Sequence, residues 1–262
     1  MEKMLVNYSV TEGVAVLELV NPPANAYSYE MFRQLDEAIL RARFDEGVHV
    51  LVIRGAGERF FCAGADIAML REAAPEFKYN FCLHANETLL RLEHTPKLVI
   101  AAINGHCVGG GLEVAMAADI RVAKAGGGKV GLPEVALGVL PGTGGTQRLA
   151  RILGKSRAIE LMARGDTLSV EEARALGLIN QVFPAESFWE DTLRFARSFC
   201  PPGKAARAVG HIKRSVQSGL EVPLESGLAL ERELQQRLFT SEDAREGIIA
   251  FLEKRAPQFR GR

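Results

Sequence analysis

The chain has 262 residues, which allows one large domain or one domain with a small appendage. Apolar residues make up 47% and charged residues 24%, a globular balance that excludes disorder on the scale of a domain. Because 32 Lys and Arg offset 32 Asp and Glu, the net charge gives no reason to propose nucleic acid or an acidic membrane surface as a partner.

The cysteines and the N-terminal pattern bear on location. Cys62, Cys82, Cys107 and Cys200 form no CxxC pair and no Cys/His cluster with ligand spacing, so we expect free thiols and no metal site. Free thiols are typical of a reducing cytoplasm. The N-terminal residues lead into the alternating segment Val14–Leu19 without a signal segment, and no apolar run reaches the ~20 residues of a membrane span. We expect a soluble, cytoplasmic protein with no membrane partner.

Strand and helix patterns alternate over the first two-thirds of the chain. Val14–Leu19 alternates like a half-buried strand, and Val48–Ile53 and Leu98–Ile103 are apolar runs typical of buried strands. The apolar faces of two intervening helices are expected at Met31, Leu35, Ala38, Ile39 and Ala42, and at Phe77, Phe81, Thr88 and Leu92. This alternation predicts an α/β fold.

Two capping-box patterns mark helix starts later in the chain. Ser169 and Glu172 have the spacing that opens a short helix, and Thr240 and Asp243 repeat that spacing before a C-terminal helix. Strand patterns end near residue 186, and helical patterns follow to the C-terminus. We therefore expect an α/β core with the active site over residues 1–195 and a helical region over residues 196–262.

Two glycine motifs fail the tests for a nucleotide site. Gly154-Lys155-Ser156 resembles the end of a P-loop, but Leu149 stands where the motif needs a glycine. Gly126, Gly128 and Gly131 satisfy G-x-G-x-x-G, but Pro133 interrupts the helix that should follow, so we interpret this segment as a flexible turn. The sequence also lacks G-x-S-x-G and H-E-x-x-H, which excludes two common classes of hydrolase.

Three remaining segments can carry chemistry. The small residues of Phe61–Ile67 let a ligand approach backbone N–H groups. The glycines of Asn104–Gly111 stand at the entrance of a helix, where unpaired N–H donors and the helix dipole would stabilise an anion or a developing oxyanion. A tight turn that packs the helix on a sheet explains these glycines equally well. The third segment is Gly131–Val135, which leads to Pro141–Arg148.

Glu113 and Glu134 lie in these segments, both flanked by apolar residues, a costly setting for a carboxylate without a task or partner. Each has a structural interpretation when taken alone. The helix dipole favours Glu113 in a first turn, and a Pro-Glu pair often opens a helix. We interpret His106, the histidine in these segments, as a packing or hydrogen-bonding residue.

Together the three segments resemble the enoyl-CoA hydratase/isomerase family, also called the crotonase superfamily. The resemblance runs from Asn21–Ala26 to Ala250–Phe259. It is most specific in Ala101–Arg148, which carries the triple glycine, both glutamates and Gly-Gly-Thr-Gln-Arg in order. It implies a spiral of ββα repeats with C-terminal helices that assemble trimers, commonly paired as hexamers. The implied substrate is an acyl-CoA thioester, and no separate cofactor is implied because coenzyme A is part of the substrate.

The resemblance also implies roles for individual residues. Ala65 and Gly110 would supply the backbone N–H groups of an oxyanion hole that polarises the thioester carbonyl. Glu113 would take a proton from one water held between the two glutamates, and Glu134 would give a proton to the carbon next to the thioester. Further positions implied to bind the substrate or coenzyme A are Ala63, Gly64, Asp66, Ile67, Leu70, Gly109, Pro133 and Gly142.

The implied activity is that of an enoyl-CoA hydratase in fatty-acid or related acyl-CoA degradation, which adds water reversibly and syn to a trans-2-enoyl-CoA and gives a 3-hydroxyacyl-CoA. Relatives that only shift double bonds often lose the first glutamate, so the presence of both favours hydration. The alternatives are a Δ3,Δ2-enoyl-CoA isomerase and a pathway-specific hydratase of branched or cyclic acyl groups. A non-catalytic or RNA-binding relative is disfavoured by the neutral charge and the intact glutamates.

The sequence departs from the family pattern at several positions. Ala68 stands where many members have a lysine that helps to bind the coenzyme, so Lys254 or Arg255 is a candidate for the phosphates. Tyr27 replaces a small or aliphatic residue, which is expected to narrow the acyl pocket. One extra residue near Gly126–Gly128 is expected to lengthen the loop between the glutamates.

Overall fold

The structure is a computed structural model that describes residues 3–262, so the first two residues of the expected core lie outside the described range. The strands are β1 (Val6–Thr11), β2 (Val14–Leu19), β3 (Val50–Gly55), β4 (Phe60–Cys62), β5 (Leu98–Ile103), β6 (His106–Val108), β7 (Ile120–Lys124), β8 (Lys129–Gly131), β9 (Thr167–Ser169) and β10 (Gln181–Phe183). The helices are α1 (Tyr29–Phe44), α2 (Ile67–Glu72), α3 (Pro75–Glu93), α4 (Gly110–Met116), the 3₁₀ helix η1 (Glu134–Leu137), α5 (Gly145–Leu153), α6 (Lys155–Arg164), α7 (Val170–Ala175), α8 (Phe188–Arg197), α9 (Ala206–Gly219), α10 (Leu224–Phe239) and α11 (Glu242–Glu253).

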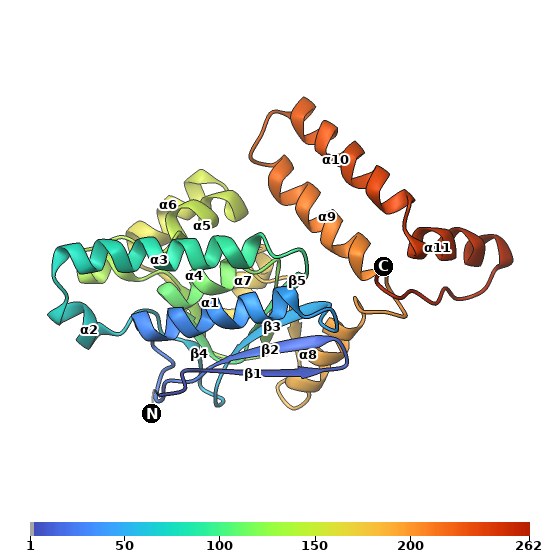
Figure 1. Ribbon diagram of the computed structural model, residues 1–262. Helices are drawn as coiled ribbons and strands as arrows, with labels where there is room; N and C mark the ends of the chain where they lie inside the picture. The colour runs from blue at the N-terminus through green and yellow to red at the C-terminus, as the bar shows by residue number, and fades with distance from the viewer. Residues whose placement is uncertain (1–2) are drawn as a thin grey trace.

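The strands form two sheets. The larger has six strands in the order β1-β2-β3-β5-β7-β10, in which only β1 and β2 pair antiparallel. The smaller has four strands in the order β4-β6-β8-β9, with β4, β6 and β8 parallel. Helices cover the sheets, and α1 runs alongside α3 on one side of the body (Figure 1). This confirms the predicted α/β fold.

A repeated ββα unit connects the two sheets. In β3-β4, β5-β6 and β7-β8 the first strand joins the large sheet and the second joins the small one, after which a helix follows. Because β4, β6 and β8 are parallel, their carboxyl ends meet at one edge of the small sheet. The segments after these three ends are 63–66, 109–113 and 132–134, which are the segments expected to carry chemistry.

The central strands of the large sheet are buried on both faces, which explains the continuous apolar runs of β3 and β5. Leu51 and Ile53 of β3 pack into the core with α1, whereas Val50 and Val52 pack into a second core with α8. The predicted apolar face of α1 is buried at every position. The face predicted for α3 is buried except at Phe77, which is 42% exposed. That part of the prediction was wrong, because the end of α3 that holds Phe77 extends beyond the sheet (Figure 1).

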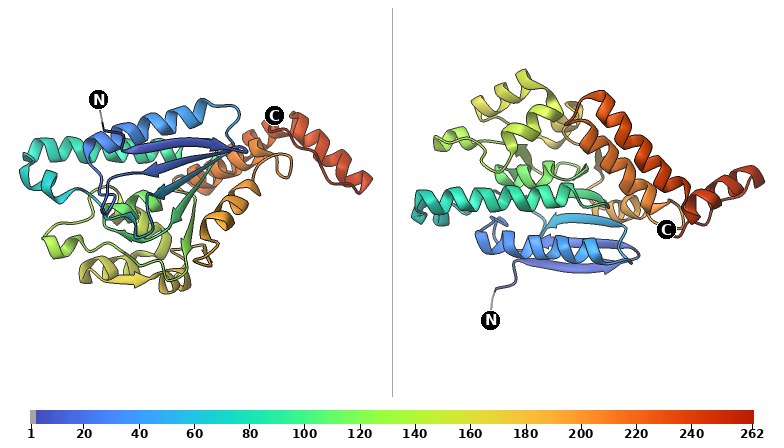
Figure 2. Two further views of the ribbon diagram at one scale, coloured as in Figure 1. Left: turned by 90° about the horizontal axis from the view of Figure 1, so that it is seen from below. Right: turned by 45° about the horizontal axis from the view of Figure 1, so that its top comes forward.

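The C-terminal helices form a separate layer. Helices α9 and α10 pair as a hairpin that projects from the body, and α11 follows at its base (Figure 2). Lys213 anchors α9 to the core, since its buried ammonium lies 2.9 Å from Asp119 Oδ2. Burial lowers the pKa of Lys213 and raises that of Asp119. The expected boundary at residues 195 and 196 falls near the end of α8, and α8 packs on the large sheet.

One predicted capping box is present and the other is not. Ser169 and Glu172 exchange hydrogen bonds at the start of α7 as predicted. At the start of α11 the N-cap is Ser241, whose Oγ accepts from Ala244 N at 3.1 Å. The box predicted from Thr240 and Asp243 was therefore wrong. The carboxylate of Asp243 instead accepts the N–H groups of residues 260 and 261 at 2.7 and 2.8 Å, a long-range contact that holds the C-terminal tail.

Candidate active site

The entrance of α4 is a run of glycines whose positions admit no side chain. Gly109 has a φ of 56°, and α4 begins at the next residue. A Cβ on Gly110 would lie 1.8 Å from Tyr27 Oη, and a Cβ on Gly111 would lie 2.0 Å from the carbonyl oxygen of Cys62. The glycines therefore do pack the helix tightly, as one interpretation expected. They also leave the Gly110 N–H at the first position of the helix, where a donor has no acceptor within the helix.

Ala65 lies beside this helix entrance, in a short parallel bridge with Tyr27. The Tyr27 N–H donates to Gly64 O at 2.8 Å, and the Asp66 N–H donates to Tyr27 O at 2.9 Å. Since both flanking residues bond toward Tyr27, the N–H of Ala65 points the other way. A Cβ on Gly64 would lie 3.0 Å from Gly110 N, so the two segments are in contact. The segments of both expected oxyanion donors are thus brought together.

Glu113 lies in the first turn of α4 and is only 1% exposed. Its Oε1 accepts hydrogen bonds from the N–H groups of Thr143 and Gly145, both at 2.7 Å. Burial raises the pKa of Glu113, whereas the hydrogen bonds from Gly145 and Thr143 and the charge of Arg148 oppose that rise. The site therefore buries this carboxylate but provides donors that stabilise its ionised form.

Glu134 has a different setting at the start of η1, directly after Pro133. A Cβ on Gly109 would lie 3.2 Å from Glu134 Oε1, so the carboxyl group reaches the entrance of α4. Its Oε2 is buried and has no hydrogen-bond partner among the described residues. Burial raises the pKa of Glu134 to about 7, and the charge of Glu113 adds to the rise. The two carboxyl groups interact, and Glu134 is the one more easily protonated near neutral pH.

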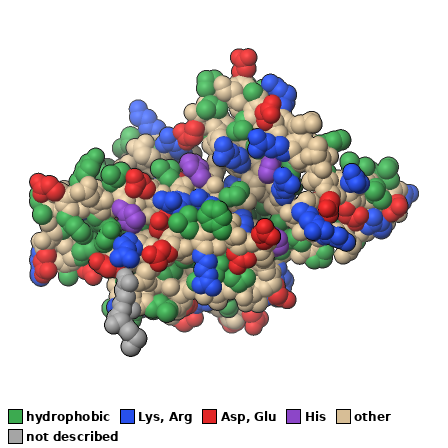
Figure 3. Space-filling view, viewed as in Figure 1, with side chains coloured by type: hydrophobic (Ala, Val, Ile, Leu, Met, Phe, Trp, Pro, Cys, Tyr) green, Lys and Arg blue, Asp and Glu red, His purple; other side chains and the backbone are tan. Residues whose placement is uncertain are grey.

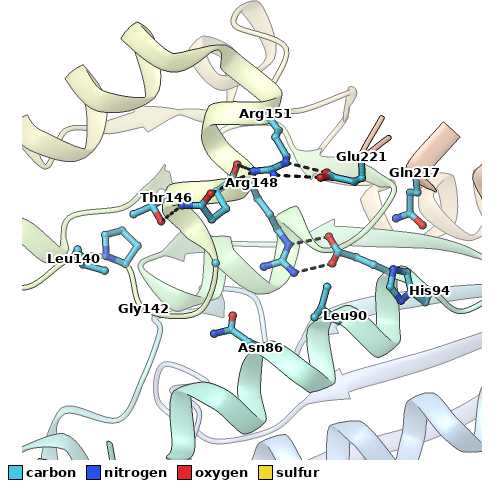
Figure 4. Close-up of a pocket in the computed structure, with 14 residues that line it drawn as sticks. Asn86, Leu90, His94, Leu140, Gly142, Thr146, Arg148, Arg151, Gln217 and Glu221 are labelled. Atoms are coloured by element: carbon cyan, nitrogen blue, oxygen red, sulfur yellow. Dashed lines mark hydrogen bonds and ion pairs between the residues drawn. The ribbon is translucent and has the colours of Figure 1, made fainter. Parts of the chain in front are cut away.

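Arg148 fixes the loop that supplies the donors to Glu113. Its guanidinium donates to both carboxylate oxygens of Glu93, at 2.8 and 2.7 Å, and to Thr143 O at 3.1 Å. The pair links α5 to α3 next to the turn at Gly142 (Figure 4). Only 12% of the Arg148 side chain and 19% of the Glu93 side chain are exposed, so this bidentate pair is stronger than an ordinary surface pair.

The other residues expected to bind the substrate lie near this centre. Asp66 is the N-cap of α2, because its carboxylate accepts the N–H groups of Ala68 and Met69. Ala63, Leu70, Pro133 and Gly142 are half-buried, and Ile67 is exposed. Their part in binding a substrate stays a prediction. His106 accepts a hydrogen bond from Lys129 N at 3.0 Å, which confirms its hydrogen-bonding role.

Lys254 and Arg255 were the candidates for binding the phosphates of coenzyme A. Arg255 is paired with both Glu246 and Glu253. Lys and Arg side chains gather where the C-terminal helices meet the body (Figure 3). The cleft there has a volume of about 650 Å³, and its basic residues are Arg43, His49, Lys97, Arg207, His211, Arg260 and Arg262. The cleft lies at the amino ends of β3 and β5, whereas the two glutamates follow the carboxyl ends of β6 and β8. The cleft is therefore not part of the glutamate site.

Thr143 is the residue of the site that the sequence did not reveal. Its hydroxyl lies 3.3 Å from Tyr27 Oη, and its N–H holds Glu113. The segment was identified by its glycines and by Gly-Gly-Thr-Gln-Arg, but no spacing rule marks a single hydroxyl within it. Tyr27 was expected only to narrow the pocket. Its hydroxyl in fact lies between the helix entrance and the loop that carries Thr143.

Within residues 3–262, no helix is long and apolar enough to cross a membrane, and no three or more His, Cys, Asp or Glu side chains are grouped to hold a metal ion. Two interacting carboxyl groups beside backbone donors have the arrangement that acid–base catalysis uses. The chain belongs to the enoyl-CoA hydratase/isomerase family, because the sequence model of that family matches residues 9–262.

Individual relatives cover almost the whole chain. A probable enoyl-CoA hydratase of Bacillus subtilis (strain 168) is 40% identical over 258 residues, which are 98% of each chain. The crotonyl-CoA hydratase of Syntrophomonas wolfei is 34% identical over 95% of each chain. The crystal structure of an enoyl-CoA hydratase from Geobacillus kaustophilus HTA426 superposes with a TM-score of 0.97 at 44% identity, covering 100% of this chain and 98% of that one. These comparisons confirm the predicted superfamily and fold.

Proposed function

We propose that the protein catalyses the reversible syn addition of water to a trans-2-enoyl-CoA thioester, giving a 3-hydroxyacyl-CoA. The observation that carries this proposal is the unequal pair of carboxyl groups. Glu113 accepts two backbone hydrogen bonds, whereas Glu134 has a buried oxygen without a partner and a pKa raised to about 7. One group is thus suited to be a base and the other an acid at the same pH.

The proposed reaction follows from these settings. The N–H groups of Ala65 and Gly110 bind the thioester oxygen and stabilise the enolate-like charge that develops there. Glu113, ionised, takes a proton from a water as its oxygen attacks the β-carbon. Glu134, protonated, gives its proton to the α-carbon. In the reverse direction each group exchanges its role, which a reversible hydration requires.

The substrate class is proposed from the same site and from the relatives. We propose a short, unbranched acyl group, because the buried Tyr27 side chain takes up space at the site and one relative is named as a crotonyl-CoA hydratase. Fatty-acid or related acyl-CoA degradation is the proposed setting, and the free cysteines among the described residues support a cytoplasmic location. A Δ3,Δ2-enoyl-CoA isomerase is the second candidate, because a carboxyl group beside an enolate can also move a proton between carbons.

The test uses crotonyl-CoA, whose conjugated absorbance disappears on hydration. We expect the wild-type enzyme to remove this absorbance and Glu113→Gln to lower kcat by ~10²-fold or more, because the amide cannot act as a base. The amide oxygen can still accept the two N–H groups, so the fold should persist. Glu87→Gln changes an exposed glutamate on α3 and is the matched control. Unchanged turnover in Glu113→Gln, or an inactive wild-type enzyme, would contradict the proposal.

We also propose that the chain assembles as a homotrimer or as a hexamer of two trimers. The support is the apolar surface of the C-terminal helices, where large side chains lie exposed on α9, α10 and α11. Exposed apolar side chains on three neighbouring helices are typical of a surface that another protein chain covers.

A further inference from the structure

The side chain of Tyr27 is buried at the centre of the candidate site. It is 3% exposed, and its ring packs edge-on against Phe32 and at a tilt against Phe81, with centroid distances of 4.7 and 6.0 Å. Its hydroxyl lies over the Cα of Gly110, where a Cβ would be only 1.8 Å away. The ring is thus held by packing, and only its hydroxyl reaches the polar groups of the site.

Among the described residues, that hydroxyl has one hydrogen-bond partner, Thr143 Oγ1, at 3.3 Å. Thr143 is itself 4% exposed, and its N–H donates to Glu113 at 2.7 Å. A hydroxyl group can accept one hydrogen bond while it donates another, and a carboxylate only accepts. When the Thr143 hydroxyl accepts from Tyr27, its own proton is therefore free to be donated toward Glu113. Burial and the charge of Glu113 raise the pKa of Tyr27 well above its ordinary value, which keeps the phenol protonated as a donor.

We propose that Tyr27 is a positioning residue for the reaction, acting through Thr143 to orient Glu113 and to stabilise its ionised form. Hydrogen bonds in such a buried chain polarise one another, so the tyrosine strengthens the donors that reach the carboxylate. The residue would therefore act on the base of the reaction and not only on the width of the pocket. The catalytic consequence rests on the proposed hydratase function, whereas the effect on the Glu113 carboxyl group does not.

Other ionisable groups face this chain and are unchanged by the variants below. They are Glu134 from η1, Arg148 from α5, Cys62 from β4 and Cys82 from α3. Burial raises the pKa of the Cys62 thiol to about 12, so it stays neutral through the range of the experiment.

The first experiment compares Tyr27→Phe with the wild type. Phenylalanine keeps the ring contacts and removes only the hydroxyl. We expect the acid limb of kcat/KM for crotonyl-CoA to move upward by about half a pH unit, with kcat lowered several-fold below neutral pH and KM nearly unchanged. Tyr8→Phe is the matched control, because Tyr8 also has a buried hydroxyl, but on β1 and without a hydrogen-bond partner in residues 3–262. Its pH profile should match that of the wild type.

The second experiment needs no turnover. The Glu113 carboxyl carbon is followed by ¹³C NMR through a pH titration of the substrate-free protein, and Tyr27→Phe should shift its midpoint upward by the same amount. Thr143→Val should give a shift at least as large, and adding Tyr27→Phe to it should add nothing. A wild-type midpoint in Tyr27→Phe, or additive shifts in the double variant, would overturn the proposal. An NMR shift in a protein that does not hydrate crotonyl-CoA would uphold it while the hydratase function fails.

Discussion

Glu113 and Glu134 differ in hydrogen bonding because the surrounding backbone supplies different donors to each carboxyl group. Glu113 lies on α4, and the segment that begins α5 directs the N–H groups of Thr143 and Gly145 at one of its oxygens. Glu134 starts a short 3₁₀ helix, and its buried Oε2 has no hydrogen-bond partner in the described part of the chain. Both groups are desolvated, but Glu113 is compensated by the N–H groups of two residues, whereas Glu134 is compensated only by the backbone of its own residue. The assignment of base and acid therefore rests on local hydrogen bonding, which flanking apolar residues in a sequence cannot show.

The buried carboxyl of Glu134 predicts a pH-dependent cost to stability. Its pKa is raised from 4.5 to about 7 in the folded protein, so the folded state favours the protonated form. The associated stability is fully present below the unfolded pKa and is lost as the pH rises through about 7. We expect Glu134→Gln to gain stability relative to the wild type over this window, because glutamine has no proton to lose.

Urea unfolding of both proteins between about pH 5 and pH 8 checks this prediction, with the midpoints compared at each pH. Since Glu113 is present in both proteins, most of its own titration cancels in the difference. A difference between the two midpoints that stays constant across the range would show that Glu134 is not shifted.

At the scale of the element, helix starts show what a local pattern can and cannot decide. Ser169 and Glu172 satisfy the capping-box spacing, and their hydrogen bonds form. Thr240 and Asp243 satisfy it equally well, yet the N-cap of the helix is one residue later, at Ser241. The reason is tertiary, because the carboxylate of Asp243 accepts the N–H groups of the C-terminal tail instead of capping its own helix.

This assignment can be tested with two neighbouring alanine substitutions. Ser241→Ala removes the hydroxyl that accepts from Ala244 N and should lower the free energy of unfolding by about 1 kcal/mol. Thr240→Ala removes only a bond to the Arg237 carbonyl at the end of α10 and should cost less. Denaturant unfolding of the two variants measures the order. A larger loss of unfolding free energy in Thr240→Ala would show that Thr240 is the N-cap, as the sequence predicted.

At the scale of the whole molecule, apolar periodicity predicted the parts of the fold that are long and buried. Val14–Leu19 and Leu98–Ile103 match β2 and β5 residue for residue, because their apolar side chains fill the cores on the large sheet. The small sheet was not predicted. Its strands have about three residues each, too few for a period of two to be distinguished from a loop.

The small sheet is what assembles the site, so the site could be predicted only in part. Motif resemblance predicted Glu113, Glu134 and the two backbone donors as site residues, and the structure brings their segments together. The resemblance could not identify Thr143 or the role of the Tyr27 hydroxyl, because their contact joins residues 116 positions apart. Such a contact depends on how β4, β6 and β8 align, and no local signal encodes that alignment.

The exposed apolar face of α9 leads to the last prediction. Ile212, Val216 and Leu220 recur at every fourth residue and are 63%, 57% and 80% exposed. Burying such a stripe against other copies of the chain would remove it from water, which favours assembly. We expect the wild-type protein to sediment as a trimer or hexamer, and the double variant Ile212→Glu and Val216→Glu to sediment as a monomer. Introduced carboxylates would have to be desolvated at the interface without partners.

Met4→Glu is the control for this experiment, because it places a charge on an equally exposed apolar residue just before β1, far from α9 along the chain. It should leave the sedimentation coefficient unchanged. Circular dichroism of the double variant should retain the helical signal, since both side chains are more than half exposed and the pair of Lys213 with Asp119 is unchanged. A wild-type protein that sediments as a monomer at micromolar concentration would refute the assembly, and a double variant that stays oligomeric would place the interface elsewhere.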